Sequence, residues 1–406
     1  MNPRELRIAD FNYALPEERI AQHPLEKRDA SRMLVYNDGK ITDEHFQRLP
    51  DLLPKNSLLL FNNTRVVRAR LLFPKKSGAT VELFCLEPLS PSAEIQQAML
   101  QTGESNWLCL IGNNRRWKEG VLMVNANGIQ LTAERLEQRG DAYVIRFTWS
   151  PCRLSFVELL EKLGHIPLPP YMKRSDTATD ATRYQTVFAR YDGSVAAPTA
   201  SLHFSREILD QLAANGIQSQ ELTLHVGAGT FKPVKAEAMA GHNMHREEMV
   251  IDSALVARIL NHNGPIIPVG TTALRCLESL YWLGVLLQKT PDAEVLPEIN
   301  QFTPYDIPET PNTHAALLSL QQYLQKTKQG ALPAYTALMI APAYRFRLAE
   351  AVITNFHQPQ STLLLLVAAA IGADWKKVYE HALAGPYRFL SYGDSSLLWI
   401  NRENRL

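Results

Sequence analysis

The sequence is poor in features that mark several classes of protein. Its four cysteines lie far apart and form no Cys-x-x-Cys pair, which argues against a disulfide scaffold or a zinc knuckle and indicates a reducing compartment. The longest apolar run, residues 363–371, falls well short of the roughly 18 residues that a membrane span needs. No charge of one sign dominates, because 42 Lys and Arg stand against 41 Asp and Glu. Any contact with nucleic acid must therefore come from local basic patches.

The first residues also lack the apolar stretch of a signal peptide, so we expect a cytoplasmic protein with no membrane contact. The hydrophobic fraction of 46% and the charged fraction of 20% are those of an ordinary globular protein. A chain of 406 residues is long enough for two or three domains.

The pattern of apolar residues along the chain changes near residue 65. Between residues 65 and 150, short alternating apolar runs separated by glycines predict a small antiparallel β-barrel inserted into the chain. Residues 1–64 and 151–406 are expected to form one α/β core domain of sandwich type, in which strands alternate with helices and favour a largely parallel sheet. Within this core domain, residues 287–330 predict a proline-rich surface loop followed by an amphipathic helix.

Several elements of the core domain can be placed by residue number. Residues 15–19 resemble a helix start, and Ser205 is a good cap for a helix that ends at Gly216. Strands are expected at residues 57–61, 221–226, 265–269 and 351–354. In a parallel sheet the turns that follow such strands gather at the carboxyl edge, where ligands bind. This arrangement would bring His225, Thr271 and His357 together.

Two Gly/Thr turns follow predicted strands. The first, residues 227–230, reads Gly-Ala-Gly-Thr and could hold an anionic group or a ribose hydroxyl, or could be a tight turn. The second, Gly270-Thr271-Thr272, opens a helix and suits a carboxylate or phosphate, although a threonine could simply cap the helix. Arg275 and Glu278 follow on that helix and could form an ion pair.

The histidines are candidate bases. His357 precedes a helix N-terminus, which lowers an imidazole pKa and favours the neutral form, although the ring could instead bond a backbone carbonyl. His225 lies on the polar face of its strand. His242, His245 and Glu248 are spaced three apart and would share a helix face, as metal ligands or as a polar surface segment. We expect no metal there, because the chain lacks a His-Glu-x-x-His motif.

Basic residues cluster in three places. Arg65, Arg68, Arg70, Lys75 and Lys76 lie at the start of the predicted barrel. Arg115, Arg116 and Lys118 surround Trp117, while Lys173, Arg174 and Arg183 form a third group. Basic residues beside an aromatic ring suit an RNA backbone and a stacked base, but a solvated surface is the common alternative.

The segments taken together resemble the S-adenosylmethionine:tRNA ribosyltransferase-isomerases of queuosine biosynthesis over nearly the whole chain. The matching segments are residues 61–66, 164–171, 183–187, 194–204, 223–234, 270–279, 354–365 and 387–394. The chain departs from the family pattern at three positions, with Asn63 for Asp, Ser201 for Gly and Gln360 for Lys. An α/β domain with an inserted β-barrel is the fold that the resemblance implies.

The resemblance also implies an activity. Members transfer and isomerise the ribosyl part of S-adenosylmethionine onto 7-aminomethyl-7-deazaguanine at the tRNA wobble position, which gives epoxyqueuosine and releases adenine and methionine. No step needs a metal or a redox group, so we expect no cofactor, with S-adenosylmethionine as a co-substrate. We also expect a monomer. A paralogue with the same fold that uses a different RNA or a free base is the alternative, and a non-catalytic RNA-binding protein is a more distant one.

These considerations predict the site residues. The catalytic groups are expected among His203, His225 and His357. The expected substrate-binding residues are Asn62, Thr64, Arg65, Ser194, Thr199, Gly227, Gly229, Thr230, Gly270, Thr271, Thr272, Arg275, Glu278, Asn355, Ser361 and Thr362. The expected RNA-binding residues are Arg68, Arg115, Arg116, Lys173, Arg174 and Arg183.

Overall fold

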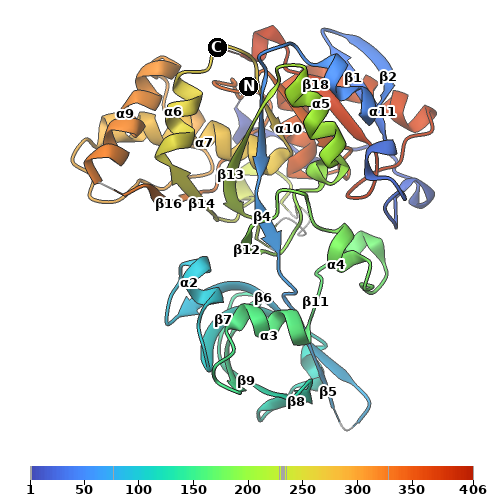
Figure 1. Ribbon diagram of the computed structural model, residues 1–406, viewed down its shortest axis with the longest axis vertical. Coiled ribbons are helices and arrows are strands. Elements are labelled where there is room, and N and C mark those ends of the chain that lie inside the picture. The colour runs from blue at the N-terminus through green and yellow to red at the C-terminus, as the bar shows by residue number, and fades with distance from the viewer. Residues whose placement is uncertain are drawn as a thin grey trace.

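A nine-stranded mixed sheet forms the centre of the larger part of the molecule (Figure 1). The computed structural model describes residues 2–75, 77–227, 229, 234, 236–327 and 329–405. The strand order is β16-β14-β13-β3-β15-β17-β18-β1-β2. The strands are β1 (Arg32–Asn37), β2 (Lys40–His45), β3 (Leu58–Asn62), β13 (Gln218–His225), β14 (Glu247–Asp252), β15 (Ile266–Val269), β16 (Ala331–Thr336), β17 (Ala351–Asn355) and β18 (Ser395–Trp399).

The parallel pairing is confined to part of this sheet. The central strands β13, β3, β15 and β17 run parallel to one another, and β1 is parallel to β18. The pairs β13–β14, β14–β16, β17–β18 and β1–β2 are antiparallel. The expectation of a largely parallel sheet is therefore wrong outside the centre. Parallel neighbours need a long crossover, whereas β1 and β2 are joined by the two-residue turn Asp38-Gly39, both with positive φ.

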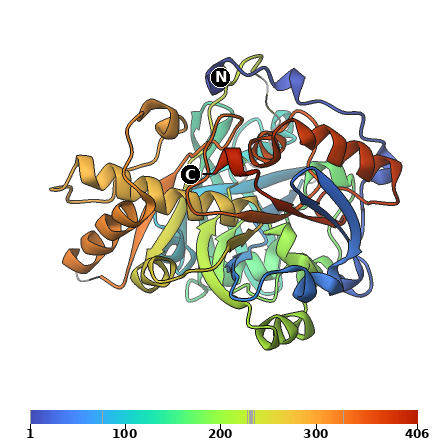
Figure 2. The same cartoon turned by 90° about the horizontal axis from the view of Figure 1, so that it is seen from above.

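Helices cover both ends of this sheet. In Figure 1, α6, α7 and α9 gather at one end, while α11 lies beside β1 and β2 at the other. Seen from above, the C-terminal segment in red lies beside the N-terminal hairpin in blue (Figure 2), as the β1–β18 pairing requires. The helices of the larger part are α1 (Leu49–Leu52), α4 (Asp180–Arg183), α5 (Arg206–Ala214), α6 (Ser253–Leu260), α7 (Thr271–Lys289), α8 (Thr303–Asp306), α9 (Thr313–Thr327), α10 (Thr362–Ile371) and α11 (Trp375–Ala384).

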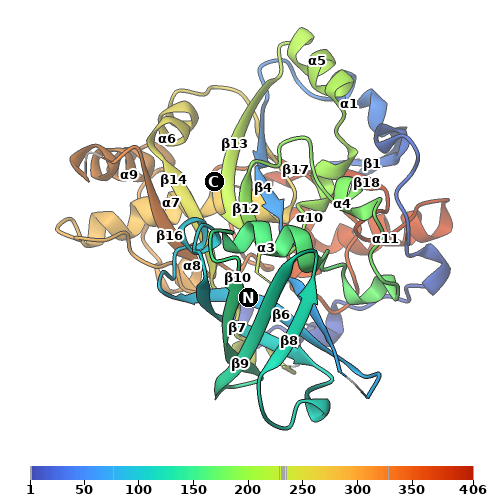
Figure 3. The same cartoon turned by 60° about the horizontal axis from the view of Figure 1, so that its bottom comes forward.

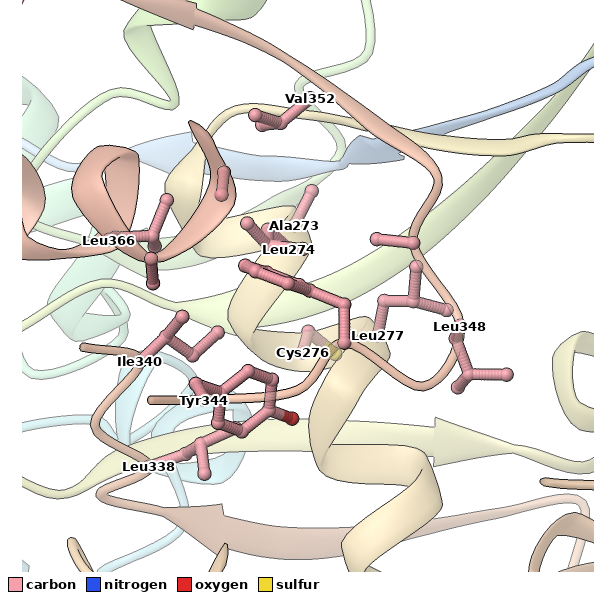
Figure 4. Close-up of a cluster of buried hydrophobic side chains, with 14 of the residues drawn as sticks. Ala273, Leu274, Cys276, Leu277, Leu338, Ile340, Tyr344, Leu348, Val352 and Leu366 are labelled. Atoms are coloured by element: carbon pink, nitrogen blue, oxygen red, sulfur yellow. The ribbon is translucent and has the colours of Figure 1, made fainter. Parts of the chain in front are cut away.

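Helix α7 runs through the main hydrophobic core. Ala273, Leu274 and Leu277 pack there against side chains from residues 338–366 (Figure 4). A side chain at Gly284 would lie 2.0 Å from the carbonyl oxygen of Ala316, so the glycine allows α9 to approach closely. The amphipathic helix expected before residue 330 is thus confirmed as α9. The segment before it is less irregular than expected, because it contains α8.

The N-terminal helix start expected at residues 15–19 is wrong. This stretch forms a single 3-10 turn, Glu17–Arg19. Ile20 then forms a parallel bridge to Phe389, and the Arg19 guanidinium donates to the carbonyl oxygens of Leu383 and Gly385. Tertiary pairing with the C-terminal segment therefore outweighs the local helix signal.

The smaller part is a curved antiparallel sheet with its own hydrophobic core (Figure 3). Its order is β11-β5-β6-β7-β10-β9-β8, with bounds β5 (Arg70–Pro74), β6 (Thr80–Ser90), β7 (Glu104–Gly112), β8 (Leu122–Ala126), β9 (Ile129–Arg139), β10 (Ala142–Ser150) and β11 (Gly164–His165). Among the described residues no pairing joins the two end strands, so the sheet is a half-barrel and the expected closed barrel is not confirmed.

Two short helices belong to the smaller part. Helix α2 (Ile95–Met99) follows β6, and α3 (Phe156–Leu163) follows β10. Phe156 and Leu160 of α3 pack into the core of the curved sheet, although they lie beyond residue 150, where we expect the inserted segment to end. The two parts are connected by a parallel ribbon of β4 (Thr64–Val66) and β12 (Tyr191–Ser194) (Figure 1). No helix among the described residues is long and apolar enough to cross a membrane.

Candidate active site

A small cavity of about 140 Å³ lies at the carboxyl ends of β15 and β17, where α7 and α10 begin. We call it the edge cavity. Its lining includes the predicted residues Thr199, Gly270, Thr271, Thr272, Asn355, His357, Ser361 and Thr362. None of the described residues that line it carries a charged side chain. An anion placed there would meet two helix N-termini and no competing carboxylate.

The start of α7 leaves hydrogen-bonding groups available to a ligand. Its N-cap is Gly270, which has φ +95 and supplies no side-chain cap. Thr272 is partly buried, and its buried Oγ1 has no partner among the described groups. At the second helix, by contrast, Ser361 Oγ accepts from the backbone N–H of Leu364 at 3.2 Å. Ser361 therefore caps α10, while α7 has uncapped donors facing the cavity.

His357 is buried in the wall of the edge cavity. Its ring Nε2 lies 2.9 Å from Thr354 Oγ1, and its backbone N–H donates to the Tyr379 hydroxyl at 3.0 Å. The ring is thus bonded to a hydroxyl, and the alternative of a backbone carbonyl does not apply to this nitrogen. Burial lowers the pKa of His357 to about 4, so the imidazole is neutral near pH 7.

His203 lies behind the same cavity. Its ring Nε2 is 3.3 Å from Asn355 Nδ2, and Asn355 Oδ1 accepts from the Thr199 hydroxyl at 2.9 Å. Burial lowers the pKa of His203 to about 4. His203 therefore contacts the edge cavity through Asn355, a residue that lines it.

A second and larger cavity, of about 740 Å³, lies between α2 of the curved sheet and strands β13 and β14 of the large sheet. We call it the inter-sheet cavity. Its charged lining among the described residues consists of Glu94, Glu221, Glu248, Asp252 and Arg190. Figure 1 shows α2 projecting from the curved sheet toward the larger part. This cavity is strongly acidic, in contrast to the edge cavity.

His225 lines the inter-sheet cavity, not the edge cavity. The expectation that His225, Thr271 and His357 lie together is therefore wrong for His225. The reason is that His225 ends β13 with its ring beside Gln96 of α2, and Gly193 packs directly against that ring. The two cavities are nevertheless close. Gly193 contacts His225 and Ala197 lines the edge cavity, and four residue steps span at most about 14 Å.

His225 and Glu248 are cross-strand partners in the β13–β14 pair. His225 Nδ1 and Glu248 Oε1 are both buried and have no hydrogen-bond partner among the described groups. The ring Nε2 of His225 lies 3.4 Å from the Gln96 amide nitrogen. Burial lowers the pKa of His225 to about 4. Burial, followed by the charge of Glu94, raises the pKa of Glu248 to about 7.

Gly229, from the first Gly/Thr turn, packs against His245 beside a buried ion pair. Arg275 Nη1 donates to Glu247 Oε2 at 2.6 Å, and His245 Nε2 lies 3.0 Å from Glu247 Oε1. A side chain at Gly229 would lie 2.3 Å from the His245 ring. The pairing expected between Arg275 and Glu278 is therefore wrong, because Glu247 holds the guanidinium. Gly227 is half-buried, and Thr230 lies outside the described residues.

The metal-like spacing of His242, His245 and Glu248 does not fall on a helix. His242 and His245 lie between a 3-10 turn, Met239–Gly241, and β14, which contains Glu248. His245 is bonded to Glu247, whereas Glu248 faces the inter-sheet cavity. In the described part of the chain no group of three or more His, Cys, Asp or Glu residues could hold a metal ion.

Glu278 lies among hydrogen-bond donors of the protein core. It is fully buried, and its carboxylate accepts from the Tyr344 hydroxyl at 2.8 Å and from the backbone N–H groups of Arg347, Leu348 and Ala349. This cluster lies in the main core beside the residues drawn in Figure 4. This buried position in the core does not favour the expected contact of Glu278 with a substrate.

Three further predicted residues connect strands. Asn62 Nδ2 donates to the Leu224 carbonyl at 2.9 Å, and Asn62 Oδ1 accepts from the Leu224 N–H. Ser194 Oγ donates to Thr64 Oγ1 at 2.7 Å and accepts from the Val226 N–H. All three side chains are completely buried. Their polar groups join β3, β13 and the connecting ribbon.

The predicted RNA-binding residues fall into two groups. Arg115, Arg116 and Lys173 are exposed, with Lys173 Nζ 2.5 Å from Glu17 Oε1, and Arg68 is half-exposed. Arg174 instead forms a bidentate pair with Asp180, at 2.7 and 2.8 Å, and Arg183 donates to the carbonyl oxygens of Leu25 and Glu26. The predicted substrate-binding Arg65 is exposed and pairs with Glu161 and Asp192.

The acidic lining of the inter-sheet cavity was not predicted from the sequence. Glu94 begins α2, where its carboxylate accepts from the backbone N–H groups of Gln96 and Gln97. A glutamate before a five-residue helix gives no signal for a ligand site. Asn63 also lines this cavity and donates to Glu221 Oε2 at 3.1 Å. The Asp that the resemblance leads us to expect at this position would repel Glu221, so Asn63 and Glu221 are compatible as a pair.

Comparison with known proteins identifies the family. A family model described as "Queuosine biosynthesis protein" matches residues 8–398. The S-adenosylmethionine:tRNA ribosyltransferase-isomerase of Azoarcus sp. is 37% identical over 98% of both chains. The protein of the same name from Xanthomonas oryzae is 38% identical over 97% of both. A solved structure of an S-adenosylmethionine tRNA ribosyltransferase from Thermotoga maritima is 26% identical, with a TM-score of 0.45 over 96% of this chain and 99% of that one. The extent of the family match and the identity to the two named relatives show that the chain belongs to the S-adenosylmethionine:tRNA ribosyltransferase-isomerase family of queuosine biosynthesis, a family of transferase and isomerase enzymes.

Proposed function

We propose that the protein transfers and isomerises the ribosyl part of S-adenosylmethionine onto 7-aminomethyl-7-deazaguanine at the wobble position of a tRNA. The products are epoxyqueuosine in the tRNA, adenine and methionine. Membership of the family supports the reaction class. The observation that carries the assignment to this chain is a pair of neighbouring cavities, one uncharged and one acidic.

The edge cavity suits the methionine end of S-adenosylmethionine. The carboxylate would accept hydrogen bonds from the uncapped backbone N–H groups of α7 and from the Thr271 and Thr272 hydroxyls. With no lysine or arginine lining the described cavity, helix dipoles and neutral donors supply the attraction. The ribose would then extend toward the segment that separates the two cavities.

His357 is the base that this placement favours. The sulfonium group acidifies the neighbouring ribose carbon, so a neutral imidazole can take a proton from it. His357 is neutral at pH 7 and lines the same cavity as the proposed carboxylate site. His203, which contacts Asn355, would act as a positioning residue. No step assigned to these residues requires a metal or another cofactor.

The tRNA would approach from the side of the curved sheet. Arg68, Arg115, Arg116 and Lys173 are accessible to phosphate groups. The net charge of +1 provides no strong overall attraction, so local contacts must hold the RNA. We propose that the protein acts as a monomer.

Adenine release is the test of this function. Purified protein is incubated with S-adenosylmethionine and either tRNA carrying the aminomethyl base or the same tRNA carrying guanine. We expect stoichiometric adenine release with the first tRNA and none with the second. Equal release with both tRNAs, or none with either from folded protein, would contradict the proposal.

A second candidate is the same chemistry on a different acceptor, and Asn63 is the observation that favours it. This residue lines the inter-sheet cavity with Glu221 in place of the family's usual Asp. The free base 7-aminomethyl-7-deazaguanine is the discriminating acceptor. Adenine release with the free base at a rate equal to that with the tRNA would favour the second candidate.

A further inference from the structure

We propose that the inter-sheet cavity binds the acceptor nucleobase and that Glu248 takes the proton from its aminomethyl ammonium group. This inference rests on the proposed function and adds a binding site and a catalytic residue to it. The cavity volume of about 740 Å³ is large enough for a nucleoside. Enzymes that react at a base generally hold it in a pocket outside the helical stack.

The charge of the cavity selects a cationic ligand. Glu94, Glu221, Glu248 and Asp252 line it, against the single described base Arg190, which is itself 3.5 Å from Glu221. Such a lining repels an unmodified RNA backbone. A nucleobase that carries an ammonium group would instead be attracted. The acids therefore distinguish the modified base from guanine by its charge.

Glu248 is the acid with a free oxygen. Glu94 is engaged with the backbone of α2, and Glu221 with Asn63. Asp252 caps α6. Glu248 Oε2 accepts weakly from the Tyr335 hydroxyl at 3.3 Å, while Oε1 is buried and has no partner among the described groups. An unpartnered buried carboxylate oxygen costs free energy that a ligand N–H group would recover.

In the proposed step a proton passes from the ammonium nitrogen to a carboxylate oxygen of Glu248. One N–H bond of the ammonium breaks and one O–H bond forms on Glu248, which leaves a neutral amine with a free electron pair for attack on the ribose. The groups that face Glu248 are Glu94 and the backbone N–H of Ile95 from α2, Tyr335 from β16, His225 from β13 and the neighbouring Arg246. Burial and the charge of Glu94 raise the pKa of Glu248 to about 7, a value suited to exchanging a proton near neutral pH.

The mouth of the cavity supplies contacts for the rest of the nucleotide. Tyr191 lines the cavity and is 41% exposed, so its ring is available for stacking on a base. Arg190 is exposed beside it and could contact a phosphate. Gln96 and Asn63 also line the cavity. The amide of Asn63 is bonded to Glu221 and Thr223, and the amide nitrogen of Gln96 donates to the Asp192 carbonyl.

The test compares two anticodon stem-loops, one with 7-aminomethyl-7-deazaguanine and one with its uncharged isostere 7-ethyl-7-deazaguanine. Wild-type protein should bind the charged stem-loop at least tenfold more tightly at pH 7. Glu248→Gln should remove this preference and lower kcat/KM for tRNA at least tenfold, with the KM for S-adenosylmethionine unchanged. The matched control Glu294→Gln changes the same charge at an exposed position and should behave as wild type.

If Glu248→Gln fails to fold, a second variant tests binding of the base in the same cavity. Tyr191→Ala changes an exposed side chain and should weaken both stem-loops about tenfold while preserving the preference for the charged one. Retention of the preference by folded Glu248→Gln, or unaltered binding by Tyr191→Ala, would overturn the pocket assignment. Failure of the wild-type protein to release adenine with the charged tRNA would instead contradict the proposed function itself.

Discussion

Burial, more than any neighbouring charge, sets the state of the candidate catalytic histidines. His203, His225 and His357 are all buried, and this lowers the pKa of each to about 4. The residue types and their positions after strands could be recognised from the sequence. Which cavity each ring faces could not, because that depends on how α2 and the segment around Gly193 pack against β13.

Replacement of His357 tests its role as a base. His357→Asn should lower the rate of adenine release about 100-fold or more, because general base catalysis typically contributes a factor of this size. Binding of S-adenosylmethionine, measured by calorimetry, should change by less than about twofold. His314→Asn, at an exposed histidine of α9, is the control. Full turnover by His357→Asn would assign the base elsewhere.

The buried carboxylate of Glu278 is expected to stabilise the folded protein. Glu278→Gln would place an NH₂ group among the three backbone N–H donors that now bind the carboxylate. We expect the free energy of unfolding in urea to fall by about 2 kcal/mol, with the KM for S-adenosylmethionine unchanged. A raised KM with unaltered stability would instead support the substrate contact expected from the sequence.

At the scale of elements, the local pattern identified the buried central strands, but the local helix signal at residues 15–19 gave only a 3-10 turn. The strands expected at residues 57–61, 221–226, 265–269 and 351–354 are confirmed as β3, β13, β15 and β17. Ser205 caps α5 as expected, through the N–H of Ile208. The hairpin of β1 and β2 has a local signal in its Asp38-Gly39 turn. The antiparallel pairs β14–β16 and β17–β18 could not be predicted, because each joins segments far apart in the chain.

The contact between α2 and the connecting ribbon depends on one glycine. A side chain at Gly193, which has φ +135, would lie 2.2 Å from Ile95 of α2. Gly193→Ala should therefore displace α2 and weaken tRNA binding at least tenfold. The control is Gly216→Ala, because Gly216 also has positive φ but nothing within 4 Å of the added atom. Equal binding by both variants in a filter-binding assay would refute this role.

At the scale of the whole molecule, the neutral buried histidines link stability to pH. Each has a lower pKa in the folded state than the value of about 6.5 in the unfolded state, so the unfolded chain binds more protons between about pH 4 and 6.5. Their contribution to stability is complete above about pH 6.5 and is lost as the pH falls toward 4. Glu248 has a raised pKa in the folded state, so its contribution to stability is instead lost as the pH rises.

A comparison between variants isolates the effect of one histidine. Urea unfolding of wild type and His203→Gln is measured at pH 7, 6 and 5. The wild-type free energy of unfolding should fall more steeply with decreasing pH, by up to about 1.4 kcal/mol per pH unit. Parallel curves for the two proteins would show that His203 is not held neutral by the fold.

In the proposed reaction the two neighbouring cavities bring S-adenosylmethionine and a cationic nucleobase together for ribosyl transfer. The decisive experiment incubates the folded protein with S-adenosylmethionine and the modified tRNA, digests the tRNA and identifies its nucleosides by mass spectrometry. We expect 7-aminomethyl-7-deazaguanosine to be converted to epoxyqueuosine. If both substrates bind but the nucleoside is recovered unchanged, or is methylated, the proposed reaction is refuted.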